Sequence, residues 1–301
     1  MATPMKRLLI IAGSDSGGGA GIQADIKTAT CFGVFATTAI TALTAQNTLG
    51  VQGIFDVPPA FIAQQIQSVL TDIGTDAIKT GMLHGAAVIE TVVSALDAYQ
   101  SQKISDISAS ESRLNGVGSP PMTAAEDVAQ PNSRNLMELV LVVDPVMVAK
   151  GGAPLLQPDA IDTLKNLLLP RATLVTPNIP EAEILSGMKI STPQDMQTAG
   201  AKILALGCQA VLMKGGHLES ETLVDYLITP LETHPFTAQK HHTRHTHGTG
   251  CTYAAAIAAG LAQNLTLTQA VTRAHAFVQN AIKNAPNLGQ GQGPLGHQPL
   301  P

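Results

Sequence analysis

The stretch 241–251 reads HHTRHTHGTGC and brings histidines, a Gly-Thr-Gly turn and a cysteine together. The alanine-rich sequence 252–264 that follows has the pattern of a helix. Free N–H groups and the positive end of the dipole make a helix N-terminus a binding site for anions such as phosphate. We therefore expect an anion site made by the first amides of this helix, those of Gly248, Thr249, Gly250 and Cys251.

Cys251 allows two other interpretations. The start of a helix lowers the pKa of a thiol, so we expect Cys251 to be partly thiolate. A cysteine hydrolase needs a base beside the thiol, and His247 is four residues away but separated from it by the glycine turn. A zinc site needs a recognised ligand spacing, which the histidines do not show, and Cys31 and Cys208 lie far away in the sequence. The histidines of this disfavoured zinc site would be His241, His242, His245 and His247. We favour the anion site.

Polar side chains stand where three apolar runs end. Lys214 lies between VLM and a Gly-Gly pair, Asp144 ends a very apolar run, and Asn178 and Glu181 begin a helical pattern. A lysine in this position is a candidate for contact with phosphate. Carboxylate and amide oxygens are suited to a hydrated Mg²⁺, which keeps several of its waters. The alternatives are a solvated lysine and an ordinary helix start at Asn178.

Two stretches nearer the N-terminus carry further candidates. Residues 12–28, AGSDSGGGAGIQADIKT, match neither the dinucleotide-binding nor the P-loop pattern, and predict a tight strand-to-helix turn that a ligand can approach closely. Asp25 falls early in the following helix, where it either complements the helix dipole or contacts a ligand. Gln46 and Asn47 are expected in a loop. A glutamine amide both donates and accepts, which suits an aminopyrimidine, although most loop amides only satisfy the backbone.

A parallel sheet is the element that would bring these residues together. Apolar runs at 7–13, 76–83, 139–147, 172–178 and 210–216 predict buried strands, and the stretches 59–70 and 195–207 predict helices between them. Such alternation predicts a mostly parallel sheet with helices on both faces. Ligands of these folds bind beyond the carboxyl ends of the strands, where the candidate residues stand.

Composition narrows the classes of function. The chain has 301 residues, 45% of them hydrophobic and 13% charged, with a formal charge of −5, so no basic surface for nucleic acid is expected. No apolar run reaches eighteen residues and the apolar run near the N-terminus is too short for a signal peptide, so we expect no membrane span and a cytoplasmic location. The Ser- and Pro-containing segment 101–137 is expected to be a flexible surface insertion within a single domain, 1–301; an active-site lid is the alternative.

The ordered set of motifs resembles one family. Stretches 12–25, 41–52, 78–83, 142–147, 176–185, 211–217, 246–251 and 289–297 are similar to hydroxymethylpyrimidine/phosphomethylpyrimidine kinases, of the ribokinase-like superfamily. The resemblance covers nearly the whole chain except 101–137. It implies a three-layer α/β/α sandwich and suggests a homodimer. It also implies the phosphorylation of 4-amino-5-hydroxymethyl-2-methylpyrimidine and of its monophosphate in thiamine biosynthesis, with ATP and Mg²⁺. Pyridoxal kinase of the same superfamily and a non-catalytic pyrimidine-binding protein are the alternatives.

The resemblance also assigns residues. It implies that Gln46 reads the pyrimidine, that Met82 forms a pocket wall, that Asp25 lies near the substrate, and that Lys214 meets the ATP phosphates. Asn178 and Glu181 match the motif of the Mg²⁺–phosphate network, in which Asp144 is a further metal candidate, through water. Gly248, Thr249, Gly250 and Cys251 match the anion hole. We also expect Gly13 to bind the substrate and Thr176 the nucleotide.

Overall fold

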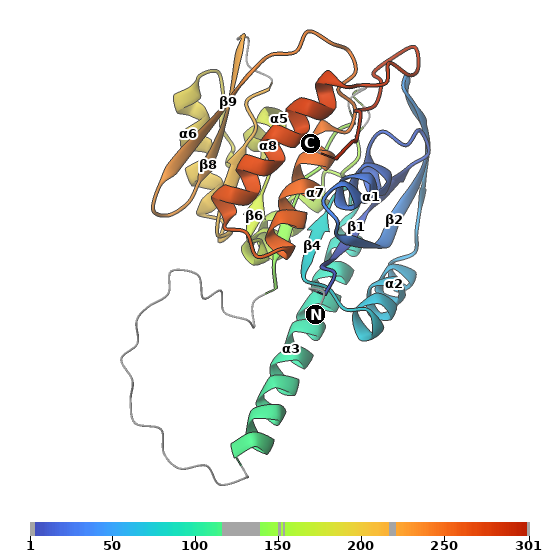
Figure 1. Ribbon diagram of the computed structural model, residues 1–301, viewed down its shortest axis with the longest axis vertical. Helices are drawn as coiled ribbons and strands as arrows, with labels where there is room; N and C mark the ends of the chain where they lie inside the picture. Colours follow the sequence, from blue (N-terminus) through green and yellow to red (C-terminus); the bar gives the residue numbers. More distant parts are fainter. Residues whose placement is uncertain (1–3, 116–138, 150–151, 153, 217–220, 300–301) are drawn as a thin grey trace.

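One sheet forms the centre of the molecule. The computed structural model describes residues 4–115, 139–149, 152, 154–216 and 221–299. Within them, nine strands follow the order β3-β2-β1-β4-β5-β6-β7-β8-β9 (Figure 1). The strands are β1 Arg7–Asp15, β2 Phe35–Asn47, β3 Gly50–Asp56, β4 Ala77–Thr80, β5 Leu141–Val143, β6 Leu174–Val175, β7 Val211–Met213, β8 Thr222–Ile228 and β9 Thr233–Gln239. The strands from β2 to β7 pair in parallel, whereas β3, β8 and β9 add antiparallel edges.

The five predicted strands are confirmed as β1, β4, β5, β6 and β7. Their apolar runs are continuous because both faces of the sheet are covered by helices. In β1, for example, all four residues from Leu8 to Ile11 are fully buried. Leu9 and Ile11 pack on one face, and Leu8 and Ile10 on the other.

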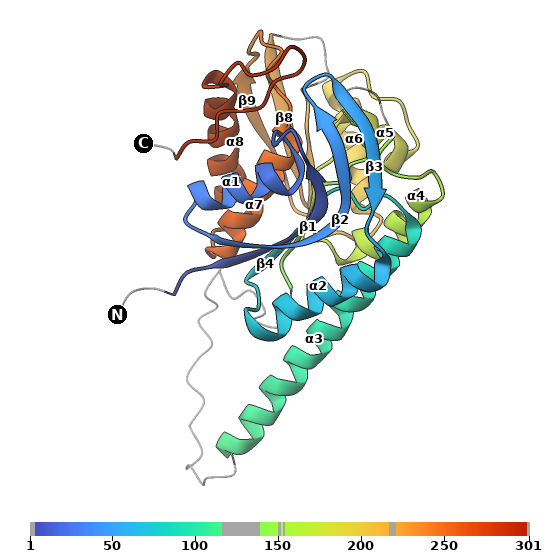
Figure 2. The same ribbon diagram turned by 90° about the vertical axis from the view of Figure 1, so that its right-hand side faces the viewer.

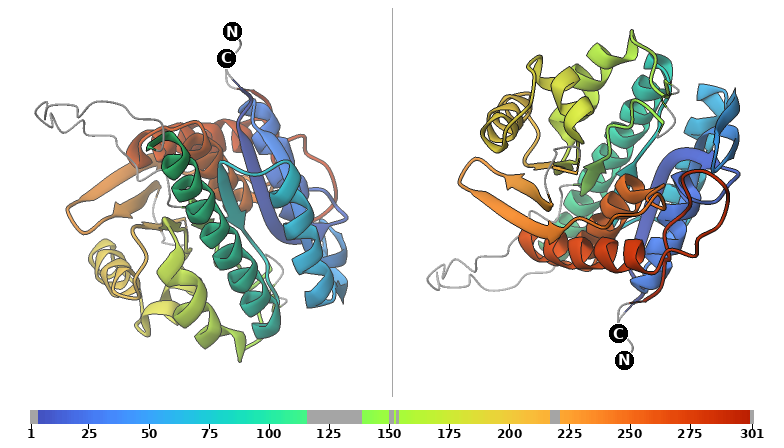
Figure 3. Two further views of the ribbon diagram at one scale, coloured as in Figure 1. Left: turned by 90° about the horizontal axis from the view of Figure 1, so that it is seen from below. Right: turned by 90° about the horizontal axis from the view of Figure 1, so that it is seen from above.

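Helices form the two outer layers, seen from both ends in Figure 3. On one face lie α1 Gly21–Cys31, α7 Thr249–Ala262 and α8 Leu267–Lys283. On the other lie α2 Pro59–Asp72, α3 Ala86–Asn115, α4 Ala160–Thr163, α5 Ile179–Ser186 and α6 Pro193–Leu204, with short π- and 3₁₀-helical turns over Leu164–Leu168 and Leu169–Arg171. The predicted helices at 59–70 and 195–207 are α2 and α6. The three-layer α/β/α architecture with a mostly parallel sheet is confirmed.

Helix α3 includes part of the segment 101–137 that was expected to be an irregular insertion. It continues to Asn115 and extends away from the sheet (Figures 1 and 2), so residues 101–115 are helical rather than irregular. The reason is local: residues 86–115 contain neither Gly nor Pro, so nothing interrupts the helix before Gly116. The rest of the segment, 116–137, lies outside the described residues. No described helix is both long enough and apolar enough to cross a membrane.

The hairpin of β2 and β3 corrects a second expectation. Gln46 and Asn47 do not lie in a loop; they end β2 and pair with Val51 and Gly50 of β3. The strand continues past the body of the sheet because β3 turns back along it, at the edge shown in Figure 2. Gln46 is therefore held on a strand, with its backbone fixed by the ladder.

Candidate active site

The N-terminus of α7 is built on glycine. The helix begins at Thr249, so Gly250 and Cys251 lie in its first turn, as the anion-site hypothesis requires. Its N-cap residue, Gly248, has a φ of 85°, and a Cβ there would overlap the carbonyl oxygen of Gly19. Only glycine allows α7 to start this close to the turn after β1. The helix itself is buried from Thr252 to Ala262, so its axis and its dipole are fixed by packing on all sides.

Lys214 and Asp144 face this helix start from the neighbouring strand ends. Nζ of Lys214 lies 3.0 Å from Oδ1 of Asp144, which also accepts a hydrogen bond of 3.2 Å from Oγ1 of Thr176. A Cβ added to Gly250 would lie 3.2 Å from Nζ of Lys214 and 3.5 Å from Oδ2 of Asp144. Burial alone would lower the pKa of Lys214, but the carboxylates of Asp144 and Glu181 raise it above its usual value. The structure thus places a fixed positive charge against the predicted anion site.

Asn178 and Glu181 form a reciprocal cap at the start of α5. Oδ1 of Asn178 accepts the N–H of Glu181 at 3.0 Å, and Oε2 of Glu181 accepts the N–H of Asn178 at 2.9 Å. The ordinary helix start is therefore present in the structure. Burial raises the pKa of Glu181 to about 7, against the attraction of Lys214.

The acidic and histidine side chains near Lys214 and the glycine turn are the candidates for metal binding. In the described parts of the chain, no three His, Cys, Asp or Glu side chains lie close enough together to hold a metal ion. Of the four histidines before the glycine turn, His242 lies 3.0 Å from Glu221 and His247 2.9 Å from Asp15. Asp144 and Glu181 remain two carboxylates near Lys214, a set that fits Mg²⁺ held largely by water and substrate phosphate.

The pKa of the Cys251 thiol differs from the expected one. Burial raises the pKa of the thiol to about 12; Lys79 opposes this shift, while Asp25 and Asp144 add to it. The prediction of a lowered pKa is wrong because the helix terminus is a local effect, whereas the desolvation comes from the whole surrounding fold. Cys251 is therefore a neutral thiol in this structure.

A buried ion pair lies next to Cys251. Nζ of Lys79, in β4, lies 2.8 Å from Oδ2 of Asp25, in α1, and both side chains are fully buried. Asp25 is therefore no helix cap. Its Oδ1 is buried without a hydrogen-bond partner in the described structure, and burial raises its pKa to about 6 despite Lys79. Sequence reasoning missed Lys79, although a lysine within a strand covered on both faces was the available signal.

Gly13 and Met82 pack together at the ends of β1 and β4. Both are buried, and a Cβ on Gly13 would come within 3.1 Å of the Met82 sulfur. Met82 also packs with Ala42 of β2 and with Leu155. The hydroxyl of Thr41 donates to the Met82 carbonyl oxygen at 2.6 Å. The two predicted substrate residues therefore share one apolar wall near Gln46's strand.

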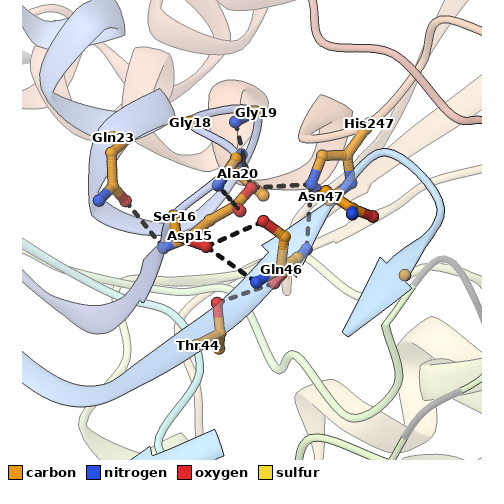
Figure 4. Close-up of polar contacts among 12 residues, drawn as sticks. Asp15, Ser16, Gly18, Gly19, Ala20, Gln23, Thr44, Gln46, Asn47 and His247 are labelled. Carbon is orange, nitrogen blue, oxygen red and sulfur yellow. Dashed lines mark hydrogen bonds and ion pairs between the residues drawn. The ribbon is translucent and has the colours of Figure 1, made fainter. Parts of the chain in front are cut away.

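Asp15 organises the glycine-rich turn (Figure 4). Its carboxylate accepts the N–H groups of Gly17, Gly19 and Ala20 at 2.8, 3.1 and 2.8 Å. Nε2 of His247 lies 2.9 Å from the same carboxylate. Burial alone would raise the pKa of Asp15, but the hydrogen bonds from His247 and from the backbone lower it. Asp15 and His247 were not among the predicted site residues; they are 232 positions apart in the chain.

Gln46 joins this cluster. Its side-chain amide lies 3.2 Å from Nε2 of His247 and 3.1 Å from Oγ1 of Thr44. Oγ1 of Thr44 also donates to the carbonyl oxygen of Ser14 at 2.9 Å. Gln46 is half-buried, so the amide is held by protein contacts but still accessible from the carboxyl edge of the sheet.

Comparisons with known proteins show the family of the chain. The phosphomethylpyrimidine kinase family matches residues 15–108 and 122–296. The chain is 44% identical over 294 residues to the thiamine biosynthesis bifunctional protein ThiED of Geobacter sulfurreducens, a match that covers 98% of this chain and 52% of that protein. The chain thus spans about half the length of that relative.

Two further relatives match along nearly their whole length. The hydroxymethylpyrimidine/phosphomethylpyrimidine kinase of Bacillus subtilis is 42% identical, with 97% of this chain and 94% of that protein covered. Among solved structures, the ADP complex of Bacillus subtilis pyridoxal kinase superposes with a TM-score of 0.78 at 34% identity, covering 98% of each chain. The fold and these matches lead to one conclusion: the chain belongs to the phosphomethylpyrimidine kinase family.

Proposed function

We propose that this chain uses ATP to phosphorylate 4-amino-5-hydroxymethyl-2-methylpyrimidine and then its monophosphate, in thiamine biosynthesis. The observation that carries the proposal is that Lys214 and Asp144 lie against the N-terminus of α7. Gln46, on β2, contacts His247 just before the same helix. A kinase needs an anion site and a positive charge at one end and a group that recognises the acceptor at the other. The hydroxymethylpyrimidine/phosphomethylpyrimidine kinase of Bacillus subtilis is 42% identical to this chain, against 34% for the pyridoxal kinase.

The α7 amides and Lys214 would provide most of the transition-state stabilisation in this mechanism. Phosphoryl transfer passes through a loose transition state, so positioning and neutralisation of charge matter more than a strong base. The amides of Gly248–Cys251 would hold the transferring phosphoryl group. Cys251, with a pKa of about 12, contributes little as a base. Oδ1 of Asp25 is unpartnered but has no exposed surface, so Asp25 would act through the buried charge that it shares with Lys79 beside Cys251, and not by direct contact with the substrate.

The nucleotide and its Mg²⁺ would lie on the same side as Lys214. Asp144, Thr176, Asn178 and Glu181 offer oxygens that a hydrated Mg²⁺ could use, through its waters. Mg²⁺, when bound there, would offset the negative charge of the phosphates. Lys214 would keep the β- and γ-phosphates directed at the start of α7.

Apolar residues exposed on β2, β3 and α2 support a homodimer. Leu43 and Phe55 face each other across the hairpin and are 45% and 68% exposed, and Phe61 of α2 is 55% exposed. Exposed apolar groups of this size gathered at one sheet edge are typical of an interface. Light scattering should give twice the chain mass, and Phe55→Ser should shift the protein toward the monomer.

The test of function is an ATP-consumption assay with hydroxymethylpyrimidine, its monophosphate and pyridoxal side by side. We expect both pyrimidines to be phosphorylated with kcat/KM well above that for pyridoxal. The variant Gln46→Leu should lose activity on the pyrimidines by at least about tenfold, the effect of one lost polar contact to a substrate. Preferred turnover of pyridoxal by the unmodified protein would reverse the assignment, and binding of the pyrimidine without ATP consumption would indicate a non-catalytic binding protein.

A further inference from the structure

The hydrogen bonds around His247 allow only one arrangement of protons. Asp15 accepts three backbone N–H groups, and these together with His247 lower its pKa, so the carboxylate is ionised at neutral pH. Nε2 of His247 lies 2.9 Å from this carboxylate. A lone pair on Nε2 would face a negative oxygen, so Nε2 must carry a proton and donate it to Asp15.

Thr44 is compatible with a donor on Gln46. Its hydroxyl has one proton and, as drawn, two acceptors within reach: the carbonyl oxygen of Ser14 at 2.9 Å and Oε1 of Gln46 at 3.1 Å. With the proton in the shorter bond, to Ser14, the lone pairs of Oγ1 face the Gln46 amide. An amide nitrogen placed there would donate to them.

The constraint at His247 selects the opposite orientation of the Gln46 amide to the one drawn in Figure 4. As drawn, the amide nitrogen faces the protonated Nε2 of His247, and two donors oppose each other. Exchanging the amide oxygen and nitrogen leaves the shape of the side chain unchanged. The single N–H of Nε2 is then shared between Asp15 at 2.9 Å and the amide oxygen at 3.2 Å, and the amide nitrogen donates to Oγ1 of Thr44. One amide N–H and one lone pair of Gln46 are then left for a ligand.

We propose that the His247–Asp15 pair is a positioning device that fixes which side of the Gln46 amide donates and which accepts. The donor and acceptor pattern required of the substrate is then set by residues that need not touch it. An aminopyrimidine presents a ring nitrogen beside an exocyclic amine, and only one amide orientation matches that order. This step rests on the proposed pyrimidine kinase function, in which Gln46 reads the ring.

Two variants at position 247 separate this role from a structural one. His247→Phe keeps a ring of similar size and leaves Asp15 its three backbone partners, but it removes the donor that orients Gln46. His247→Gln restores an N–H at about the place of Nε2 and serves as the matched control. The substrates are the aminopyrimidine and its analogue without the 4-amino group, and the measured quantity is the ratio of their kcat/KM values.

We expect His247→Phe to lower this ratio by about tenfold, mainly through KM for the aminopyrimidine, and His247→Gln to recover most of it. Equal losses on both substrates, or an unchanged ratio in His247→Phe, would overturn the proposal. If the unmodified protein phosphorylates neither pyrimidine, the proposed function fails. The positioning role is then decided by neutron diffraction of the ligand-free protein: deuterons of the Gln46 amide facing Thr44 support it, and deuterons facing His247 refute it.

Discussion

Removing Lys79 should destabilise the protein strongly, and in a way that depends on pH. Lys79 and Asp25 are fully buried, and their charged atoms lie 2.8 Å apart. At an effective dielectric constant of about 20, two unit charges at this distance attract by about 6 kcal/mol. Lys79→Met keeps the volume of the side chain and also removes the desolvation of the ammonium. The net loss expected for breaking a buried pair is therefore about 3–5 kcal/mol in the free energy of unfolding.

The dependence on pH follows from the carboxylate left behind. Burial raises the pKa of Asp25 to about 6 even with Lys79 present, and without Lys79 the pKa must rise further. Above that pKa the variant contains an unpaired buried anion. In the folded variant, Asp25 therefore takes up a proton at a pH above 6, whereas the unfolded chain does so only near pH 4. The destabilisation by Lys79→Met should thus be greatest near pH 8 and shrink toward pH 5.

Urea unfolding at pH 5, 6.5 and 8 measures this effect. The control is the double variant Lys79→Met/Asp25→Asn, which has neither charge. Its loss of stability should be about 2 kcal/mol smaller than that of Lys79→Met at pH 8, and it should not shrink toward pH 5, because position 25 then has no carboxyl group to take up a proton. A loss that does not change with pH in the single variant, or equal losses in single and double variants, would show that Lys79 acts through packing and not through its charge.

Two further predictions concern the start of α7 and of α5. Cys251→Ala should keep at least about a tenth of kcat because the thiol is neutral, whereas Gly250→Pro, which removes one first-turn amide, should lower kcat by about 10²–10³, as loss of an oxyanion donor does. Steady-state kinetics check this, and total loss in the alanine variant with an active proline variant would contradict the amide mechanism. Asn178→Ala should lower the free energy of unfolding by about 1 kcal/mol through loss of the reciprocal cap, and an unchanged urea midpoint would show that the cap contributes nothing.

The sheet was predictable because its signal is local. A parallel strand covered on both faces needs an unbroken apolar run, and β1 carries one that can be recognised without any partner. The helix start at Thr249 could be predicted in the same way, from a glycine turn before an alanine-rich run, and the anion site at that start stays a prediction. The extension of α3 was missed because the Ser-rich composition of 101–115 was weighed more heavily than its lack of Gly and Pro.

The missed parts of the site are contacts between distant positions. Asp25 and Lys79 are 54 residues apart and Asp15 and His247 are 232 apart, so neither pair can be recognised from spacing. The pKa of Cys251 was predicted in the wrong direction for the same reason. The helix terminus that lowers a thiol pKa is visible in the sequence, but the burial that raises it is produced by tertiary packing.

The charges around α7 explain why a neutral thiol suits this site. Two lysines, Lys79 and Lys214, face Asp25, Asp144 and Glu181, and burial raises the pKa of Glu181. These groups nearly balance before any phosphate arrives, so a thiolate at Cys251 would add a negative charge where the phosphoryl group must bind. Proton uptake by Glu181, or a hydrated Mg²⁺ beside it, can offset the charge of an incoming phosphate. A thiol of raised pKa leaves the positive end of α7 to the substrate, and the glycine turn is what brings that substrate close enough to use it.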